Sequence, residues 1–513
     1  MNFWPPSTRR RKRTRNNSRT EMKRDDPSSS FLWRADDDMS IQKRMNMIRL
    51  LQTNGGILLI KGFEGLADLS PDYSALHTME ELMEWLKDRK EHQFVSIQKI
   101  TLEDCTPWHF DEHSGQIRND KGTFFQIGGL QAKYPDGKYV RQPIIIQNEI
   151  GLLGIICKKI NGVWHFLMQA KIEPGNINYV QISPTIQATK SNFTRQHGGR
   201  VPAYLEMFTN TRPEDILVDQ IQSEQSSRFL GKRNRNIIIK TEGDLPETPS
   251  HRWITFYQLK QFMQYDNLIN MDTRTVFSCI PYVFMYENLY GYPEEYIRSL
   301  QKIDRDTLVA MYKRINDYKM LEAPVVSQIS LAELSDWKIE ADGVRHNSSY
   351  PFEVIFCRLE IEGREVTHWN QPLFAALGVA AFGLICTKSD GLLEVLVQLK
   401  PEVGCFDAIE LGPTVQEEYG SLNARDSVSE YFFEHISDKE KVVTDVILSE
   451  EGGRFYHEQN RNVILLAEKE DVKYDSDRYI WVSVGTLNVL TQINNCLNIQ
   501  LRNLLMLLAM VCR

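Results

Sequence analysis

The sequence predicts an α+β protein built as a tandem duplication, in which each copy holds a mixed or antiparallel sheet flanked by helices. Two observations support this prediction. Residue patterns recur at an offset of 229 positions, as when Gln142-Pro143 returns as Gln371-Pro372. Strand and helix signals also follow the same order in both copies. The period is far longer than the roughly 20–50 residues of a solenoid unit, so it indicates two duplicated domains.

The repeat extends along most of the chain, with small changes of register that loop deletions explain. The offset is 226 between Ser223-Glu224 and Ser449-Glu450, and 228 between Arg274 and Arg502. The length of 513 residues fits two large domains or three ordinary ones. We therefore expect a first repeat over residues 31–285 and a second over residues 286–513.

The charge is distributed unevenly. Residues 1–30 carry nine lysine and arginine residues and three acidic ones, whereas the net charge of the whole chain is −8. The remainder is therefore acidic, which argues against nucleic-acid binding, because such binding depends on neutralising phosphates. The basic segment has few apolar residues, so we expect residues 1–30 to be a disordered tail rather than a nucleic-acid arm.

No apolar signal region follows the basic segment, and the apolar stretch 504–511 is too short to span a bilayer. We therefore expect a cytoplasmic protein without membrane contact. The apolar stretch is either a helix at a dimer interface or an aberrant chain end. The eight cysteines include no C-x-x-C pair, which favours reduced, buried thiols over disulfides or zinc clusters.

Local signals place helices and a hairpin in the first copy. Ser40 precedes apolar residues at helical spacing, and Thr78 with Glu81 forms a capping box before another apolar run. Strand patterns at 151–158 and 163–169 are joined by Asn161-Gly162, a dipeptide that favours the positive φ angles of a type I′ turn. We therefore expect an antiparallel hairpin there.

The second copy repeats this hairpin with a physically equivalent turn, Asp390-Gly391. Each copy ends with an Asn-x-x-Asn-x-x-x-Arg segment, running from Asn267 to Arg274 and from Asn495 to Arg502. We expect both segments to be helical, with the first asparagine near the start of the helix.

The sequence lacks the common nucleotide-binding motifs. It contains neither a P-loop nor a G-x-G-x-x-G turn, which disfavours a P-loop or Rossmann enzyme. His109 and His113 have the H-x-x-E-H spacing of inverted zinc peptidases, which place both histidines on one helical face. However, Pro107 before this stretch and Gly115 after it favour a turn leading into a strand at Phe124-Phe125. We therefore expect no metal site.

Polar side chains gather around the predicted hairpin of the first copy. Gln169, Lys171 and Glu173 alternate, so they share one face of a strand, which suggests a lined cleft or, alternatively, a solvated sheet face. Segment 181–192 is rich in amides and hydroxyls that suit a neutral polar ligand or cap their own backbone. Segment 222–236 supplies guanidinium groups that either grip a diphosphate or lie in solvent.

Together these motifs resemble the nucleoside-diphosphate-hexose 2,3-dehydratases of deoxysugar biosynthesis. The similarity covers nearly all of residues 31–505 and both copies. In the first copy it rests on Gln142-Pro143, Gln169-Ala170-Lys171-x-Glu173-Pro174-Gly175-Asn176, Ser183-Pro184-Thr185-x-Gln187-x-Thr189-x-Ser191-Asn192, and Gln222-Ser223-Glu224 with Asn234-Arg235-Asn236. In the second it rests on Trp369-Asn370-Gln371-Pro372, Gly412-Pro413-Thr414-Val415-Gln416 and Ser449-Glu450-Glu451-Gly452-Gly453-Arg454-Phe455.

The resemblance implies a homodimer whose subunit holds two Nudix-like α+β domains and acts on a dTDP-4-keto-6-deoxy-hexose. The metal-binding box of Nudix hydrolases is not found in the sequence, so pyrophosphate hydrolysis is not expected. In the implied reaction, a base takes the C3 proton that the C4 ketone acidifies, and an acid assists departure of the C2 hydroxyl. The enol then tautomerises to a 3,4-diketo-2,6-dideoxy sugar.

The resemblance also bears on cofactors and partners. We expect no metal or redox cofactor, and a downstream 3-ketoreductase that consumes the product. The alternative is a non-catalytic nucleotide-sugar-binding protein, or a pseudo-enzyme that depends on a partner.

Within the matched motifs, the candidate acids and bases are Lys171, Glu173, Glu224 and nearby Glu149, with no roles assigned. We expect the substrate to be bound by Gln142, Gln147, Gln169, Asn176, Thr185, Gln187, Ser191, Asn192, Arg228, Asn234 and Arg235. The second copy has Gly412 and Glu418 where the first has Ser183 and Thr189. We therefore expect the first copy to be catalytic and the second to serve structure or non-catalytic binding, with a second pocket formed by Trp369, Gln371, Lys400, Thr414, Gln416, Arg454 and Asn460.

Overall fold

A computed structural model describes residues 62–71, 74–122, 124–190, 201–364, 366–421 and 424–511. Contacts divide the chain into two units, Met1–Ile57 and Leu58–Arg513, and all described residues belong to the second. The expected basic tail, the helical pattern after Ser40, and residues Ser191 and Asn192 lie outside the described residues. The described part is α+β, as the sequence predicts.

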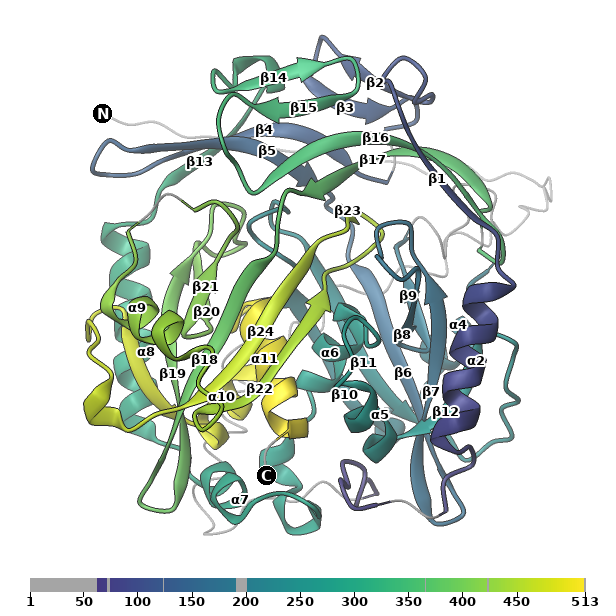
Figure 1. Cartoon of the computed structure of the whole chain (residues 1–513), viewed down its shortest axis with the longest axis vertical. Coiled ribbons are helices and arrows are strands. Elements are labelled where there is room, and N and C mark those ends of the chain that lie inside the picture. The colour runs from purple at the N-terminus through teal and green to yellow at the C-terminus, as the bar shows by residue number, and fades with distance from the viewer. Residues whose placement is uncertain are drawn as a thin grey trace, which may run out of the picture. The chain divides into compact units, whose positions relative to one another are not determined.

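Each repeat forms a seven-stranded mixed sheet, and the two sheets share one topology (Figure 1). The first contains β6 (Gly151–Ile160), β7 (Val163–Ile172), β8 (Val180–Ser183), β9 (Ile186–Ala188), β10 (Ile216–Ser223), β11 (Arg233–Lys240) and β12 (His251–Thr255). The second contains β18 (Ala380–Ser389), β19 (Leu392–Pro401), β20 (Ile409–Gly412), β21 (Val415–Glu417), β22 (Val442–Ser449), β24 (Gln459–Leu466) and β25 (Tyr479–Ser483). In both sheets one central pair is parallel, β11 with β6 and β24 with β18.

Both predicted hairpins are confirmed. Strands β6 and β7 are joined by Asn161 and Gly162, whose φ angles are 51° and 85°. Strands β18 and β19 are joined by Asp390 and Gly391, with φ angles of 50° and 71°. Positive φ at both central positions is what a type I′ turn requires, so the two dipeptides specify the same connection.

Two smaller sheets exchange one strand each between the repeats. The first contains β2 (Trp108–Asp111), β3 (Gln116–Asn119), β4 (Gln126–Lys133), β5 (Tyr139–Ile146) and β13 (Val325–Ile329). The second contains β1 (Val95–Ile100), β14 (Trp337–Glu340), β15 (Gly343–His346), β16 (Phe352–Ile361), β17 (His368–Ala376) and β23 (Phe455–Tyr456). Strand β1 of the first repeat pairs with β16, and β13, its counterpart in the second repeat, pairs with β4.

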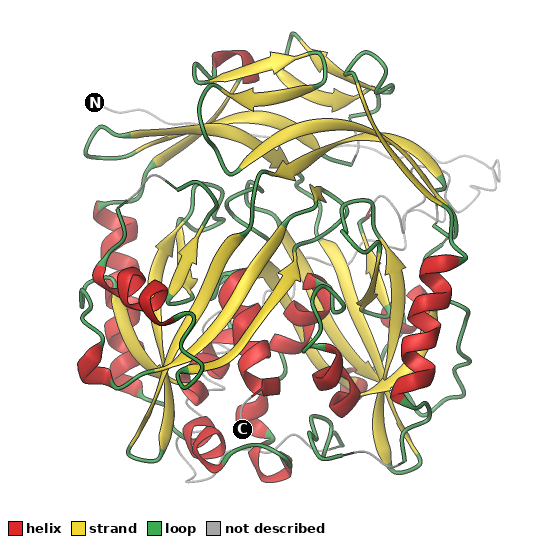
Figure 2. Ribbon diagram, in the orientation of Figure 1, coloured by secondary structure: helices red, strands yellow, loops and turns green. Residues whose placement is uncertain are grey.

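Helices cover the large sheets and fill the space between them (Figure 2). They are α2 (Met79–Glu91), α4 (Leu205–Thr209), α5 (Phe256–Phe262), α6 (Met271–Ser278), α7 (Glu294–Gln301), α8 (Arg305–Leu321), α9 (Ser427–His435), α10 (Val484–Thr491) and α11 (Ile499–Val511). Thr78 and Glu81 form the predicted capping box of α2. Helices α6 and α11 pack against each other.

The two Asn-x-x-Asn-x-x-x-Arg segments form the starts of α6 and α11. The second asparagine of each, Asn270 or Asn498, accepts a hydrogen bond from a backbone amide of the first turn. Arg274 reaches across to donate to the carbonyl oxygen of Ser449 at 2.8 Å, and Arg502 donates to that of Ser223 at 2.6 Å. The repeated motif therefore ties each helix to the opposite repeat.

The apolar stretch 504–511 is the second half of α11. It is mostly buried inside the chain itself, against α6, rather than left exposed for a dimer interface. The stretch from His109 to His113 is not helical, because it forms most of β2 and the following turn, and β3 follows at Gln116. Its histidines therefore do not share a helical face. The strand expected at Phe124-Phe125 begins at Gln126.

Two further observations concern the described residues only. Seven cysteines are free thiols and six of them are buried, as the sequence predicts, and burial raises the pKa of the Cys279 thiol to about 11. Among the residues placed by the structure, no helix is long and apolar enough to cross a membrane.

Candidate active site

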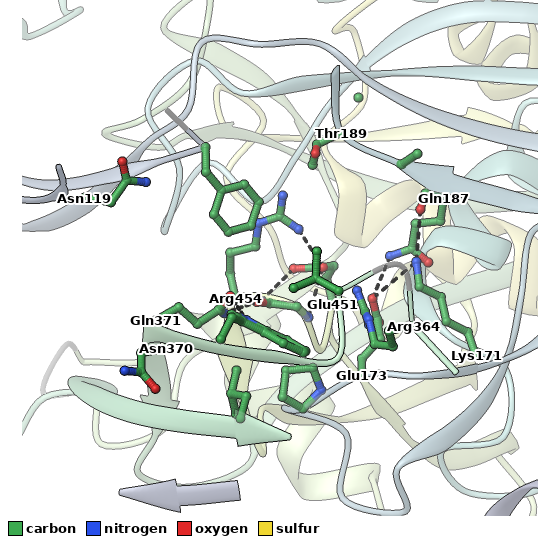
Figure 3. A pocket seen from close by; sticks show the side chains of 18 of the residues that line it. Asn119, Lys171, Glu173, Gln187, Thr189, Arg364, Asn370, Gln371, Glu451 and Arg454 are labelled. Atoms are coloured by element: carbon green, nitrogen blue, oxygen red, sulfur yellow. Dashed lines mark hydrogen bonds and ion pairs between the residues drawn. The ribbon is translucent and has the colours of Figure 1, made fainter. Parts of the chain in front are cut away.

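A cavity of about 630 Å³ is lined by residues from both repeats (Figure 3). The first repeat contributes side chains from β7, β9, β11 and the start of α6, and the second contributes β16, β17 and the loop before β23. The predicted residues that line it are Lys171, Glu173, Gln187, Glu224, Asn234, Trp369, Gln371 and Arg454.

Lys171 and Glu173 form an ion pair on one face of β7, as their alternation predicts. Lys171 Nζ lies 3.7 Å from Glu173 Oε1, and the two side chains are 11% and 3% exposed. Gln187 Nε2 donates to the same carboxylate oxygen at 3.0 Å, and Asn270 Nδ2 donates to Gln187 Oε1 at 3.2 Å. Glu173 Oε2 is buried without a hydrogen-bond partner among the described residues, so one oxygen of a fixed carboxylate stays available.

A second group of titratable side chains also lines the cavity. Glu224 accepts a hydrogen bond from Asn234 Nδ2. Burial and the nearby carboxylate of Glu451 raise the pKa of Glu224 to about 7. Burial and the guanidinium of Arg454 lower the pKa of Lys232 to about 8. Both groups therefore exchange protons near neutral pH, which is where acid–base catalysis is most effective.

The second repeat supplies one wall of this cavity. Arg454 donates to Glu451 Oε1 at 2.9 Å and to Gln147 Oε1, in the first repeat, at 3.0 Å. Trp369 Nε1 donates to Gln371 Oε1 at 2.9 Å. The sequence assigned Trp369, Gln371 and Arg454 to a second pocket, and this assignment is wrong. Loops of the two repeats cross over, so residues of the second repeat complete the cleft of the first.

Lys400, Thr414, Gln416 and Asn460, which were expected to form the second pocket, do not line the cavity. The part of the second repeat that they occupy is called the second cleft. Arg228, predicted to bind the substrate, does not line the cavity either, because its loop crosses to the second repeat and pairs with Glu418 there. Its guanidinium is 2.9 Å from Glu418 and 3.5 Å from Glu458, and it lies 4.3 Å from the ring centroid of Phe352. Arg228, the counterpart of Arg454, is therefore held by ion pairs within the chain.

Other predicted residues do not line the cavity. Thr185 Oγ1 donates to the carbonyl of Leu167, and Arg235 pairs with Asp219 at 2.6 Å on an edge of the sheet. The remaining predicted residues lie outside the cavity wall, and three of them form hydrogen bonds with neighbouring groups. Gln142 donates to the carbonyl of Ser227, and Asn176 donates to the carbonyl of Tyr179. Gln147 donates to Glu149 and accepts from Arg454, and Gln169 lies on β7.

Sequence reasoning missed several lining residues. Lys232 lies in the basic run 232–236, where the sequence prediction depends on the arginines alone. Glu451 is the counterpart of Gln225, and Asp272 is the counterpart of Gln500. A comparison of the two copies at these positions would have indicated Glu451 and Asp272, because each is a carboxylate in one copy and an amide in the other. Among the described residues, no group of three or more His, Cys, Asp or Glu side chains is placed to hold a metal ion.

Comparison with known proteins agrees with this two-repeat arrangement. A family model described as NDP-hexose 2,3-dehydratase matches residues 79–280 and 309–508, one stretch in each repeat. A dTDP-4-dehydro-6-deoxy-alpha-D-glucopyranose 2,3-dehydratase of Streptomyces violaceoruber is 37% identical, over 82% of this chain and 95% of its own length. Proteins of the same name from Saccharopolyspora spinosa and Amycolatopsis orientalis are 34% and 33% identical, over 82% and 83% of this chain and 89% of each relative. The chain therefore belongs to the NDP-hexose 2,3-dehydratase family.

Proposed function

We propose that this protein is a hydro-lyase that removes the C2 hydroxyl of a dTDP-4-keto-6-deoxy-hexose and yields a 3,4-diketo-2,6-dideoxy sugar. The observation that carries the proposal is the match to the dehydratase family over both repeats. Both repeats are needed, because the cavity takes Lys171 and Glu173 from the first repeat and Arg454 from the second. Homodimerisation and a 3-ketoreductase that consumes the product follow from the family resemblance and belong to the same proposal. A cytoplasmic location, expected because no apolar signal region follows the basic segment, belongs to it as well.

Glu173 is the base in this proposal. Its buried Oε2 has no hydrogen-bond partner among the described residues, while Gln187 holds the other oxygen. The C3–H bond breaks, its proton moves to Glu173, and its electron pair forms the enolate with the C4 ketone. Cationic groups around the cavity, Lys171 and Arg454, offset the negative charge that develops on the C4 oxygen.

Binding of the nucleotide diphosphate is assigned to basic residues of the second repeat. Arg358 and Arg364 lie on the cavity wall contributed by β16 and the segment that follows it. Arg364 donates to the carbonyl of Ile172 at 2.7 Å and lies 5.6 Å from the ring centroid of Trp369. A guanidinium fixed beside an aromatic ring suits a ligand that combines a diphosphate with a planar base.

The alternative function is nucleotide-sugar binding without turnover, and one assay separates the two. The full chain is incubated with dTDP-4-keto-6-deoxyglucose and a 3-ketoreductase that traps the diketone, and products are identified by mass spectrometry. Loss of one water from the sugar, dependent on this protein, is the expected result. Binding of the nucleotide sugar without water loss would establish the non-catalytic alternative.

A further inference from the structure

The cavity contains a carboxyl group that no sequence motif singled out, Asp272 in the first turn of α6. The residue is 2% exposed and lines the cavity. Its Oδ1 is buried and has no hydrogen-bond partner among the residues that the structure describes. A buried carboxyl oxygen that lacks a hydrogen-bond partner is costly to a folded protein, so its presence calls for a functional reason.

The surroundings of Asp272 are mainly acidic. Glu224, Glu451 and Glu173 all interact with it electrostatically, and Lys171 is the cation that opposes them. Burial and these carboxylates raise the pKa of Asp272 well above its ordinary range. This shift favours the protonated form of Asp272, whereas Glu173 is held in an ion pair with Lys171.

The second repeat shows that the helix start does not need this carboxyl group. Asn270 accepts from the amide of Thr273, and Asn498 accepts from the amide of Leu501 in the same way. The residue two positions after the cap, and two before the buried arginine, is Asp272 in one helix and Gln500 in the other. The helix thus keeps its cap with either residue, and the carboxyl is present only in the cleft that holds the cavity.

We propose that Asp272 is the general acid that protonates the departing C2 hydroxyl group, with Glu173 as its partner base. This inference rests on the proposed dehydratase function. The C2–O bond breaks with its electron pair on oxygen, that oxygen takes the proton of Asp272, and water leaves. The enolate electrons form a C2=C3 double bond while the C4 ketone is restored.

The second half of the reaction returns both residues to their starting states. The product of elimination is an enol with a hydroxyl group on C3. Asp272, now a carboxylate, takes the proton of this hydroxyl, and Glu173 delivers its proton to C2. The sugar becomes a 3,4-diketone, one water has been released, and no oxidant or reductant is consumed.

The test uses the full-length Asp272→Asn variant. It measures removal of the C3 proton and departure of the C2 hydroxyl group separately. One measurement follows exchange of the C3 proton in D2O by NMR, and a second follows water loss by mass spectrometry. A third uses the 2-deoxy-2-fluoro analogue of the substrate, because fluoride leaves without protonation. We expect water loss to fall about 10²–10⁴-fold, while C3 exchange and fluoride release persist near the wild-type rates.

Gln500→Leu, at the equivalent position of the second repeat, is the matched control and should leave all three rates unchanged. Asp272→Ala provides a second variant, in which added formate should restore water loss by supplying the missing acid. An Asp272→Asn protein that loses C3 exchange or fluoride release in parallel with water loss, or that keeps full water loss, would overturn the assignment. Wild-type protein that neither exchanges C3 nor loses water would instead refute the proposed function itself.

Discussion

The backbone amide of Gly175 in the first repeat donates a 2.7 Å hydrogen bond to the carbonyl oxygen of Gly452 in the second. The equivalent bond joins Gly404 to the carbonyl of Ser226 at 3.0 Å. The first contact fixes the loop that carries Glu451 and Arg454 into the cavity. A Cβ atom on Gly175 would lie 1.5 Å from the carbonyl oxygen of Phe455, so the position has no room for a side chain.

We predict that Gly175→Ala destabilises the protein by about 3 kcal/mol and also lowers turnover, because the crossing loop must move away. Thermal unfolding and the water-loss assay measure the two effects. Gly243→Ala is the control, since its Cβ would have its nearest neighbour 3.6 Å away, at Thr241 Oγ1. Equal thermal midpoints for the two variants would contradict the close contact.

Glu173→Gln should lower turnover about 10²–10⁴-fold, because an amide cannot take the C3 proton. Glu402→Gln is the matched control. Glu402 accepts from Gln416 Nε2 at 3.0 Å, as Glu173 does from Gln187, but it does not line the cavity. Nucleotide-sugar affinity is measured alongside turnover. Loss of turnover in Glu402→Gln with near-normal turnover in Glu173→Gln would show that the second cleft is the catalytic one.

Glu450 should make the stability of the wild-type protein depend on pH. Burial and the neighbouring Glu458 raise its folded-state pKa to about 8 from the ordinary value of 4.5. Between these values the folded protein holds a proton that the unfolded chain releases. The stabilising contribution is therefore complete below the unfolded pKa and is lost as pH rises to about 8, by up to about 1.4 kcal/mol per pH unit.

Glu450→Gln removes this titration. The thermal midpoint of the variant minus that of the wild type should therefore rise from pH 5 to pH 9, a range that includes the folded-state pKa of about 8. The amide oxygen of the glutamine can still accept from Asn460, which donates to Glu450. Glu434→Gln, at an exposed glutamate, is the control. A difference that stays constant across the range would refute the prediction.

Glu418→Thr should destabilise the protein by about 2 kcal/mol without changing turnover. The substitution removes one carboxylate from Arg228, whose side chain is 4% exposed, and leaves the other at Glu458. The cost should therefore be smaller than the roughly 3–5 kcal/mol of breaking a buried pair outright. Chemical denaturation measures the free energy of unfolding, and the water-loss assay measures turnover. A large fall in turnover would show that the second cleft takes part in the reaction.

Local sequence signals predicted local structure well. The type I′ turns at Asn161-Gly162 and Asp390-Gly391, the capping box at Thr78 and the alternation of Lys171 with Glu173 each depend on neighbouring residues only, and the structure confirms all of them. These features follow from backbone sterics and strand geometry, which a short segment of sequence contains.

The composition of the cavity could not be predicted in the same way. Whether Arg228 or Arg454 lies beside Lys171 depends on which loop crosses to which cleft, and both loops carry an Arg-Phe pair at the equivalent positions. The pairing of β1 with β16 is likewise a choice between two similar partners far apart in the chain. Asp272 could not be predicted from the residues that the two repeats share, because this position holds glutamine in the second repeat.

Because β1 pairs with β16 and β13 pairs with β4, neither half of the polypeptide completes its own small sheet. Two identical half-length chains could complete their small sheets by exchanging this strand. Such a symmetric dimer, however, would carry every substitution in both subunits. Covalent fusion of the halves removes that constraint, so one cleft can keep Asp272 while the other takes Gln500. The two clefts can therefore differ in sequence when one gene encodes both repeats, but not when the protein is a dimer of identical subunits.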